Sequence, residues 1–142
     1  AAELFLRHLH RPLWPGCRLQ LSTNRGVVFG IAMPRWAVLL ATVAAMGFVG
    51  AYFGLSDRRA FGVHLALAMI LAGALGNLYD RLFAVVRVPP LEPIRYQVRD
   101  FLDCSRLYWP YVFNVADVLL VVGVGLLMLL HVVANVRAAR QA

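Results

Sequence analysis

The chain has 142 residues, of which 61% are hydrophobic and 15% are charged, whereas soluble domains carry about 25% charged residues. The formal net charge is +7, and all fourteen basic residues are Arg. These Arg residues are scattered between apolar stretches, which argues against a soluble nucleic-acid-binding protein. The composition favours a single membrane domain over residues 1–142, with Arg side chains that contact membrane lipids near the helix ends.

The first segment, residues 1–35, is too polar to span a membrane. Its run from Arg18 to Gly30 alternates polar and apolar residues and then reaches Asn and Gly. This pattern is typical of short strands joined by a turn. We therefore predict short strands near the N-terminus.

Three apolar stretches reach the length of about 20 residues that a membrane-spanning helix needs. They cover residues 36–55, 60–79 and 112–136. The polar residues 56–59 leave room only for a tight turn, so the first two helices are expected to form an antiparallel hairpin. Glycines recur in the second and third stretches, and small residues let membrane helices pack closely. The predicted fold class is an all-α polytopic membrane protein, a helical bundle.

Residues 80–111 form a long polar loop in this prediction. Four prolines exclude one continuous helix. Within the loop, residues 98–102 are amphipathic and are expected to dip back toward the bilayer. The loop lies on the side of the membrane opposite to the Arg-containing turn 56–59 and the C-terminal tail, which the positive-inside rule places in the cytoplasm.

The sequence twice places an Asn three residues ahead of an Asp beside an apolar helix: Asn77 with Asp80, and Asn114 with Asp117. A carboxylate at the edge of hydrocarbon is costly, so each pair is a functional-site hypothesis. The spacing puts Asn and Asp on one helical face. We expect the Asn amide to donate to its own neighbouring carboxylate, and the topology predicts both Asp residues at the same membrane face.

Other chemistries are excluded by composition. No Lys is present for a Ser/Lys dyad, and no His-Glu-x-x-His motif is present for a zinc protease. His64 and His131 each lie more than about 20 Å along a helix from the nearest motif and are interpreted as packing or headgroup residues. Cys17 and Cys104 have no metal-ligand spacing, and two Cys residues alone do not predict a disulfide. We predict no metal and no cofactor.

Carboxylate chemistry remains: two Asp residues that share one proton and activate a water molecule. Asp80, Asp100 and Asp117 compete for the two places. Asp80 is followed by Arg81, which suits a structural ion pair, but the residues alone leave the choice open. A small transporter or proton-relay subunit is the alternative from another class, although such proteins usually carry their charges near the bilayer midplane.

Four motifs in order resemble those of the bacterial lipoprotein signal peptidase, signal peptidase II. They are Asn24-x-Gly26, Gly73-Ala74-Leu75-Gly76-Asn77-Leu78-Tyr79-Asp80-Arg81, Val98-x-Asp100-Phe101 and Phe113-Asn114-Val115-Ala116-Asp117. The resemblance implies an aspartic endopeptidase of the bacterial inner membrane. Such an enzyme cleaves prolipoproteins before a diacylglyceryl-modified Cys at the extracytoplasmic face and is inhibited by the cyclic peptide globomycin.

The resemblance also assigns roles to residues. The catalytic dyad matches Asp100 and Asp117. Positions that support the dyad or bind substrate match Asn24, Gly26, Asn77, Asp80, Arg81, Asn114 and Ala116. The resemblance also implies a small extracytoplasmic β-like cradle near the N-terminus, which includes Asn24 and Gly26.

The chain departs from the family pattern in three ways. The family's first of four helices has no counterpart here, Arg25 stands in place of the usual Thr, and the spacing from Asp80 to Asp100 is longer. The first of these departures alone supports a further alternative, a non-catalytic relative that binds lipidated precursors.

Overall fold

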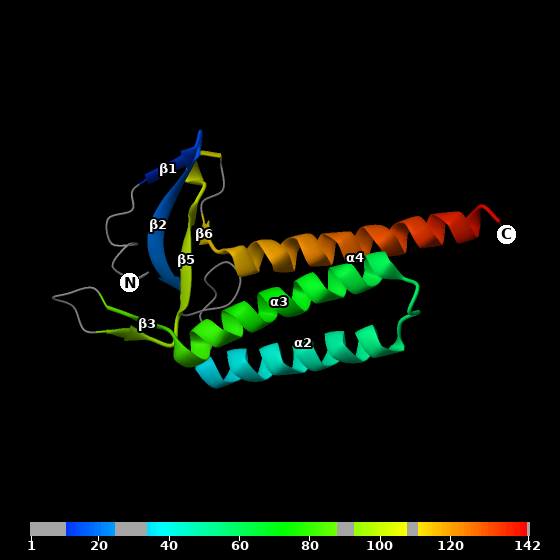
Figure 1. The fold of residues 1–142 in the computed structure, drawn as a ribbon, viewed down its shortest axis with the longest axis horizontal. Helices are drawn as coiled ribbons and strands as arrows, with labels where there is room; N and C mark the ends of the chain where they lie inside the picture. The colour runs from blue at the N-terminus through cyan, green and yellow to red at the C-terminus, as the bar shows by residue number, and fades with distance from the viewer. Residues whose placement is uncertain (1–10, 25–33, 88–92, 108–110, 142) are drawn as a thin grey trace. The chain divides into compact units, whose positions relative to one another are not determined.

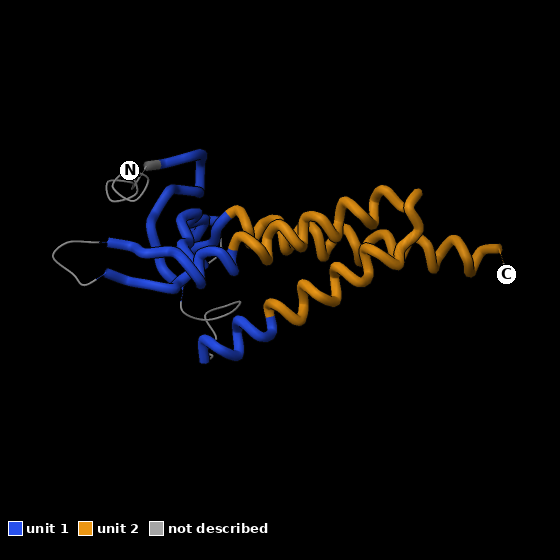
Figure 2. The backbone as a smooth tube through the Cα atoms, turned by 60° about the horizontal axis from the view of Figure 1, so that its bottom comes forward, with its two compact units in different colours: residues 1–41, 77–114 blue, residues 42–76, 115–142 orange. Residues whose placement is uncertain are grey.

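A computed structural model of the chain describes residues 11–24, 34–87, 93–107 and 111–141. The chain divides into two compact units (Figure 2). The first comprises residues 1–41 and 77–114, and the second comprises residues 42–76 and 115–142. Each unit is described by itself below.

The first unit is built on a four-stranded antiparallel sheet with the strand order β1-β2-β5-β6 (Figure 1). The strands are β1 (Arg11–Trp14), β2 (Cys17–Asn24), β5 (Val98–Asp103) and β6 (Val112–Phe113). The β-like cradle expected in the N-terminal segment therefore obtains its other two strands from far along the chain. In β5 the side chains of Val98 and Asp100 are both buried, as expected for residues two apart on one face of a strand.

The amphipathic residues 98–102 have an extended backbone. They form β5, because β2 supplies a ladder partner along this stretch: Ser22 lies opposite Asp100, and Asn24 lies opposite Val98. The preceding residues form a two-stranded hairpin of β3 (Val85–Val86) and β4 (Ile94–Arg95). A 3-10 turn, η2 (Ser105–Leu107), follows β5.

A disulfide between Cys17 and Cys104 joins the start of β2 to the end of β5. This bond was not predicted from the sequence, because 87 residues separate the two Cys residues and only the strand pairing brings them together. Beside the disulfide, Arg18 Nε donates to Asp103 Oδ2 at 2.6 Å, and Ser105 N donates to Asp103 Oδ1 at 2.9 Å. The backbone hydrogen bond from Ser105 is the main cause that lowers the pKa of Asp103; the bond from Arg18 adds to it, and burial opposes both.

Within the described ranges, three helices are long and apolar enough to cross a membrane: α2 (Arg35–Leu55), α3 (Phe61–Phe83) and α4 (Val115–Ala139). With the small sheet, they confirm the predicted fold class of a helical polytopic membrane protein. Helix α3 continues past residue 79 to Phe83, so its last turns carry Asn77 and Asp80. Helix α4 begins at Val115 rather than at residue 112, because Val112–Phe113 pairs with β5 as β6.

Glycines bring α3 and α4 together in the second unit. A Cβ added at Gly123 would lie 2.8 Å from Ile70 Cγ1 and 2.9 Å from the backbone oxygen of Ala66. A Cβ at Gly73 would collide with the backbone oxygen of Ala116. Both contacts are closer than a side chain tolerates, so the helices approach at these points only because the residues are Gly.

Polar contacts supplement this packing. His131 Nε2 and Tyr52 Oη form a hydrogen bond of 2.8 Å, and His64 Nε2 and Ser56 Oγ form one of 2.9 Å. Both bonds join residues of the second unit, which agrees with the packing role expected for the two His residues. Between α2 and α3, Asp57 Oδ1 accepts from the backbone N–H of Arg59 at 2.9 Å, a turn typical of Asp.

Candidate active site

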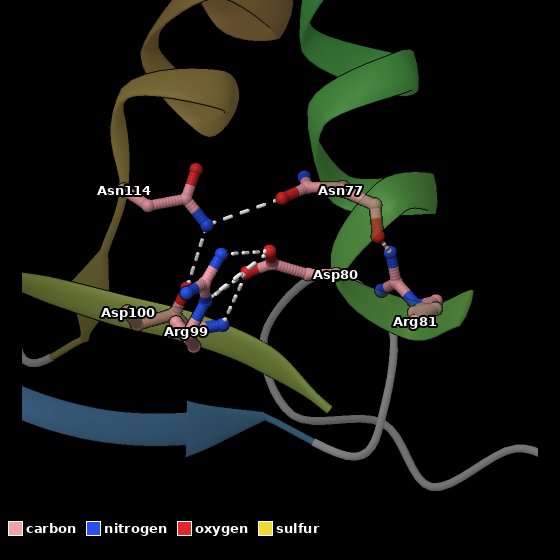
Figure 3. A network of polar contacts seen from close by, with 6 residues as sticks. All are labelled: Asn77, Asp80, Arg81, Arg99, Asp100 and Asn114. Carbon is pink, nitrogen blue, oxygen red and sulfur yellow. Dashed lines mark hydrogen bonds and ion pairs between the residues drawn. The ribbon is translucent and has the colours of Figure 1, made fainter. Parts of the chain in front are cut away.

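The last turns of α3 face β5 through an ion pair between Asp80 and Arg99 (Figure 3). Arg99 Nη2 donates to Asp80 Oδ1 at 2.6 Å, Arg99 Nε lies 3.2 Å from both carboxylate oxygens, and the backbone N–H of Arg99 donates to Oδ2 at 2.9 Å. The Asp80 side chain is only 11% exposed. The sequence suggested a structural pair between Asp80 and its neighbour Arg81. The partner in the structure is Arg99, 19 residues further along the chain.

A second connection joins the two Asn residues of the repeated motif to Asp100. Asn114 Nδ2 donates to Asp100 Oδ1 at 2.8 Å and to Asn77 Oδ1 at 3.1 Å (Figure 3). All three residues are buried, with Asp100 4% exposed. The two hydrogens of the Asn114 amide therefore connect β5 and α3 at one point. The expectation that each Asn amide serves its own neighbouring Asp does not account for this bridge.

The Asp80–Arg99 ion pair and the Asn114 bridge use neighbouring positions on α3 and β5. On α3, Asn77 and Asp80 are one helical turn apart and face the same way. On β5, the consecutive residues Arg99 and Asp100 point to opposite sides of the strand. As a result the cation of this strand neutralises Asp80, and Asp100 accepts a hydrogen bond from a neutral amide. A buried carboxylate fixed in this way is suited to accept a proton from a water molecule.

The remaining predicted site residues belong to the first unit, to the second unit or to a segment outside the described ranges. Arg81 Nη1 donates to the backbone oxygen of Asn77 at 3.3 Å. Asn24 ends β2, opposite Val98 in the ladder, and Gly26 lies outside the described residues. Ala116 and Asp117 occupy the first turn of α4 in the second unit, where Ala116 packs against the small residues of α3.

Two residues at this site were not predicted from the sequence. They are Arg99 and Ser22, which lies opposite Asp100 in the ladder. Recognising either residue requires the register in which β2 pairs with β5. No group of three or more His, Cys, Asp or Glu residues with metal-ligand geometry is present in the described part of the chain.

Comparisons with known proteins agree with these motifs. The profile of a family described as signal peptidase (SPase) II matches residues 2–133. The lipoprotein signal peptidase of Desulfitobacterium hafniense is 40% identical over 109 residues, which cover 75% of this chain and 63% of that protein. The lipoprotein signal peptidase of Aquifex aeolicus is 36% identical over 137 residues, or 91% of this chain and 72% of that protein. The chain thus spans less than two thirds of the length of the first curated relatives it matches.

Solved structures support the fold. A bacterial membrane enzyme determined by the in meso method at 2.3 Å resolution superposes with a TM-score of 0.78 at 20% identity, covering 94% of this chain and 80% of the other. A second such structure, at 1.9 Å resolution, gives a TM-score of 0.71 at 20% identity, covering 90% of this chain and 81% of the other. The family profile, the similar relatives and the shared fold agree, and the chain belongs to the signal peptidase II family of multi-pass membrane proteins.

Proposed function

We propose that this protein is an aspartic endopeptidase that removes signal peptides from prolipoproteins, cleaving before a diacylglyceryl-modified Cys. The observation that carries the proposal is the buried Asp100, whose carboxylate is held by Asn114 at 2.8 Å. In a protein whose described residues include three apolar spans, burial of a carboxylate is costly and favours a functional role. Family membership supports the substrate class.

The second carboxylate of the proposed dyad is Asp117. It lies three residues beyond Asn114 in the first turn of α4, and three residues extend at most about 10 Å. The residue that binds Asp100 is therefore closely tethered to Asp117. In the mechanism, one carboxylate accepts a proton from water while the water oxygen attacks the scissile carbonyl. The other carboxyl group donates a proton to the leaving nitrogen, and the amide bond breaks.

The disulfide supports an extracytoplasmic position for the first unit, at the outer face of the bacterial inner membrane. Disulfides persist in oxidising compartments and are rare in the cytoplasm, and Cys17–Cys104 lies in the sheet that carries Asp100. The Arg residues of the turn 56–59 and of the C-terminal tail are then cytoplasmic, in accordance with the positive-inside rule.

The test is cleavage of a diacylglyceryl-modified precursor by the full-length protein in detergent micelles. Asp100→Asn and Asp117→Asn are each expected to lower the rate by at least about a hundredfold. Asp57→Asn removes a carboxylate from the exposed α2–α3 turn and should cleave at the wild-type rate. Globomycin should inhibit the wild-type protein. Unimpaired cleavage by either dyad variant would remove the proposed mechanism, and a wild-type protein that binds the precursor without cleaving it would indicate a non-catalytic relative.

A further inference from the structure

A cavity of about 330 Å³ lies where the β3–β4 hairpin joins α3 and β5. Its lining residues come from the last turn of α3, the first strand of the hairpin and β5: Tyr79, Phe83, Ala84, Val85, Arg87 and Arg99. The volume is at the lower end of the range for small-ligand sites, about 300–1,000 Å³. All of the lining residues belong to the first unit.

The hairpin turns two cationic side chains to one face. Val85 lies opposite Arg95 in the β3–β4 ladder, and Arg87 is two residues beyond Val85, so all three lie on the same face. Val86, on the other face, is 3% exposed and packs into the protein. The face that carries the Arg residues therefore includes the part of the hairpin that lines the cavity.

The charges around the cavity do not balance. Arg99 is neutralised by its ion pair with Asp80 at 2.6 Å. Arg87 and Arg95 are exposed, and neither has a hydrogen bond or ion pair with any residue in the described ranges. Within the described part of the chain, two guanidinium groups are thus available to an external anion. An Arg side chain binds phosphate well, because its planar fork donates two parallel hydrogen bonds.

The aromatic wall indicates where that phosphate comes from. The rings of Tyr79 and Phe83 have centroids 5.3 Å apart and are 59% and 63% exposed. They lie in the last turn of a helix long enough to cross a membrane. Aromatic rings at the end of a spanning helix occupy the headgroup level of the bilayer. At this level the nearest abundant phosphates are those of phospholipids.

The base of the hairpin is well fixed. The backbone N–H of Tyr96 donates to the backbone oxygen of Ala84 at 3.0 Å, and the guanidinium of Arg35 lies 4.1 Å from the centre of the Tyr96 ring. Tyr96 has a φ angle of 62°, which a residue other than Gly adopts only where its surroundings hold it. These contacts fix the backbone at Ala84, one of the residues that line the cavity.

We propose that this cavity binds the phosphate of an anionic membrane phospholipid, with Arg87 as the main cation and the rings of Tyr79 and Phe83 against the glycerol and the first acyl carbons. A zwitterionic headgroup fits less well, since none of the lining residues that the structure describes is acidic and none of them pairs with its ammonium group. This binding goes beyond the proposed peptidase activity and does not depend on it.

The experiment is native mass spectrometry of the purified full-length protein in a non-ionic detergent. Dioleoylphosphatidylglycerol, dioleoylphosphatidylcholine, uncharged dioleoylglycerol and inorganic phosphate are each titrated separately. We expect the phosphatidylglycerol to bind most tightly. Arg87→Gln should weaken its first binding step by about tenfold, which is the usual effect of losing one charge-assisted hydrogen bond, and Arg87→Lys should retain part of the affinity. Arg58→Gln, which removes the same charge from the α2–α3 turn, is the matched control and should bind like the wild type.

Three results would overturn the proposal. Equal effects of Arg87→Gln and Arg58→Gln would mean that only net charge matters. Equal binding of phosphatidylcholine or dioleoylglycerol would mean that the anionic phosphate is not recognised. Binding of inorganic phosphate as tight as that of the lipid would assign the site to a soluble anion.

Discussion

Replacing Asp80 with Asn removes the charge that holds Arg99 and leaves the shape of the side chain nearly unchanged. In the folded protein Asp80 accepts from the backbone N–H of Arg99 at 2.9 Å and from its guanidinium at 2.6 Å. Removing one partner of a buried pair costs about 3–5 kcal/mol, whereas an exposed pair contributes about 0–1 kcal/mol. The Asp80 side chain is 11% exposed and that of Arg99 is 30% exposed. The expected loss is therefore intermediate, about 2–3 kcal/mol.

A double-mutant cycle separates the pair from its surroundings. Asp80→Asn, Arg99→Met and the double variant are unfolded by an anionic detergent in mixed micelles, and their free energies of unfolding are compared. We expect a coupling energy of about 1.5–3 kcal/mol, because Arg99→Met removes the cation that the carboxylate needs. Asp57→Asn, in an exposed turn, should change stability by less than about 0.5 kcal/mol. Additive single effects, within about 0.5 kcal/mol, would show that the ion pair does not stabilise the junction of α3 and β5.

Three further changes test the disulfide, the helix packing and the sheet. Replacing Cys17 and Cys104 by Ser opens a loop of 87 residues and should lower the free energy of unfolding by about 4.5 kcal/mol in the chain-entropy estimate. An unchanged midpoint of detergent unfolding, with and without dithiothreitol, would contradict this stabilising role of the disulfide. Gly123→Ala should destabilise the α3–α4 pair by about 1–3 kcal/mol, because the added Cβ would lie 2.9 Å from the α3 backbone. Gly125→Ala is the control and should be nearly neutral, since an added Cβ there has nothing within 4 Å. Equal effects of the two substitutions would count against the close approach of the helices. The pKa of Asp103 is lowered, mainly by the backbone N–H of Ser105. The ionised carboxylate therefore contributes to the free energy of unfolding above the ordinary Asp pKa of about 3.9. This contribution is lost as the pH falls through the lower pKa of the folded protein. The stability of Asp103→Asn should therefore depend less on pH below about pH 4 than that of the wild type, and identical pH dependences would refute the assignment.

The spanning helices were predictable because their signal is local. A run of about 20 apolar residues needs no partner to be recognised, and the polar residues 56–59 mark the turn between α2 and α3. The sheet was only half predictable. Alternation within residues 18–24 indicated a strand, but its partner β5 lies far along the chain, with Asn24 opposite Val98, and such non-local pairing leaves little trace in a single sequence.

The same physical reason explains what was missed at the site. Sequence spacing placed Asn77 with Asp80 and Asn114 with Asp117, since a helical turn brings such residues to one face. In the structure Asn114 donates to Asn77 and to Asp100, which that spacing did not predict. Likewise, Asp80 binds Arg99, although Arg81 is the neighbour of Asp80 in sequence. The reason is that β5 brings the Arg99 guanidinium to the end of α3. Local spacing identified the participants, and tertiary contacts determined their pairing.

The most direct test of the proposed peptidase is the rate at which the purified full-length protein releases the signal peptide from a diacylglyceryl-modified precursor, with the product identified by mass. The proposal predicts a single cut before the modified Cys and a loss of at least about a hundredfold in that rate for Asp100→Asn. Cleavage by Asp100→Asn at the wild-type rate would contradict the central role assigned to this buried carboxylate.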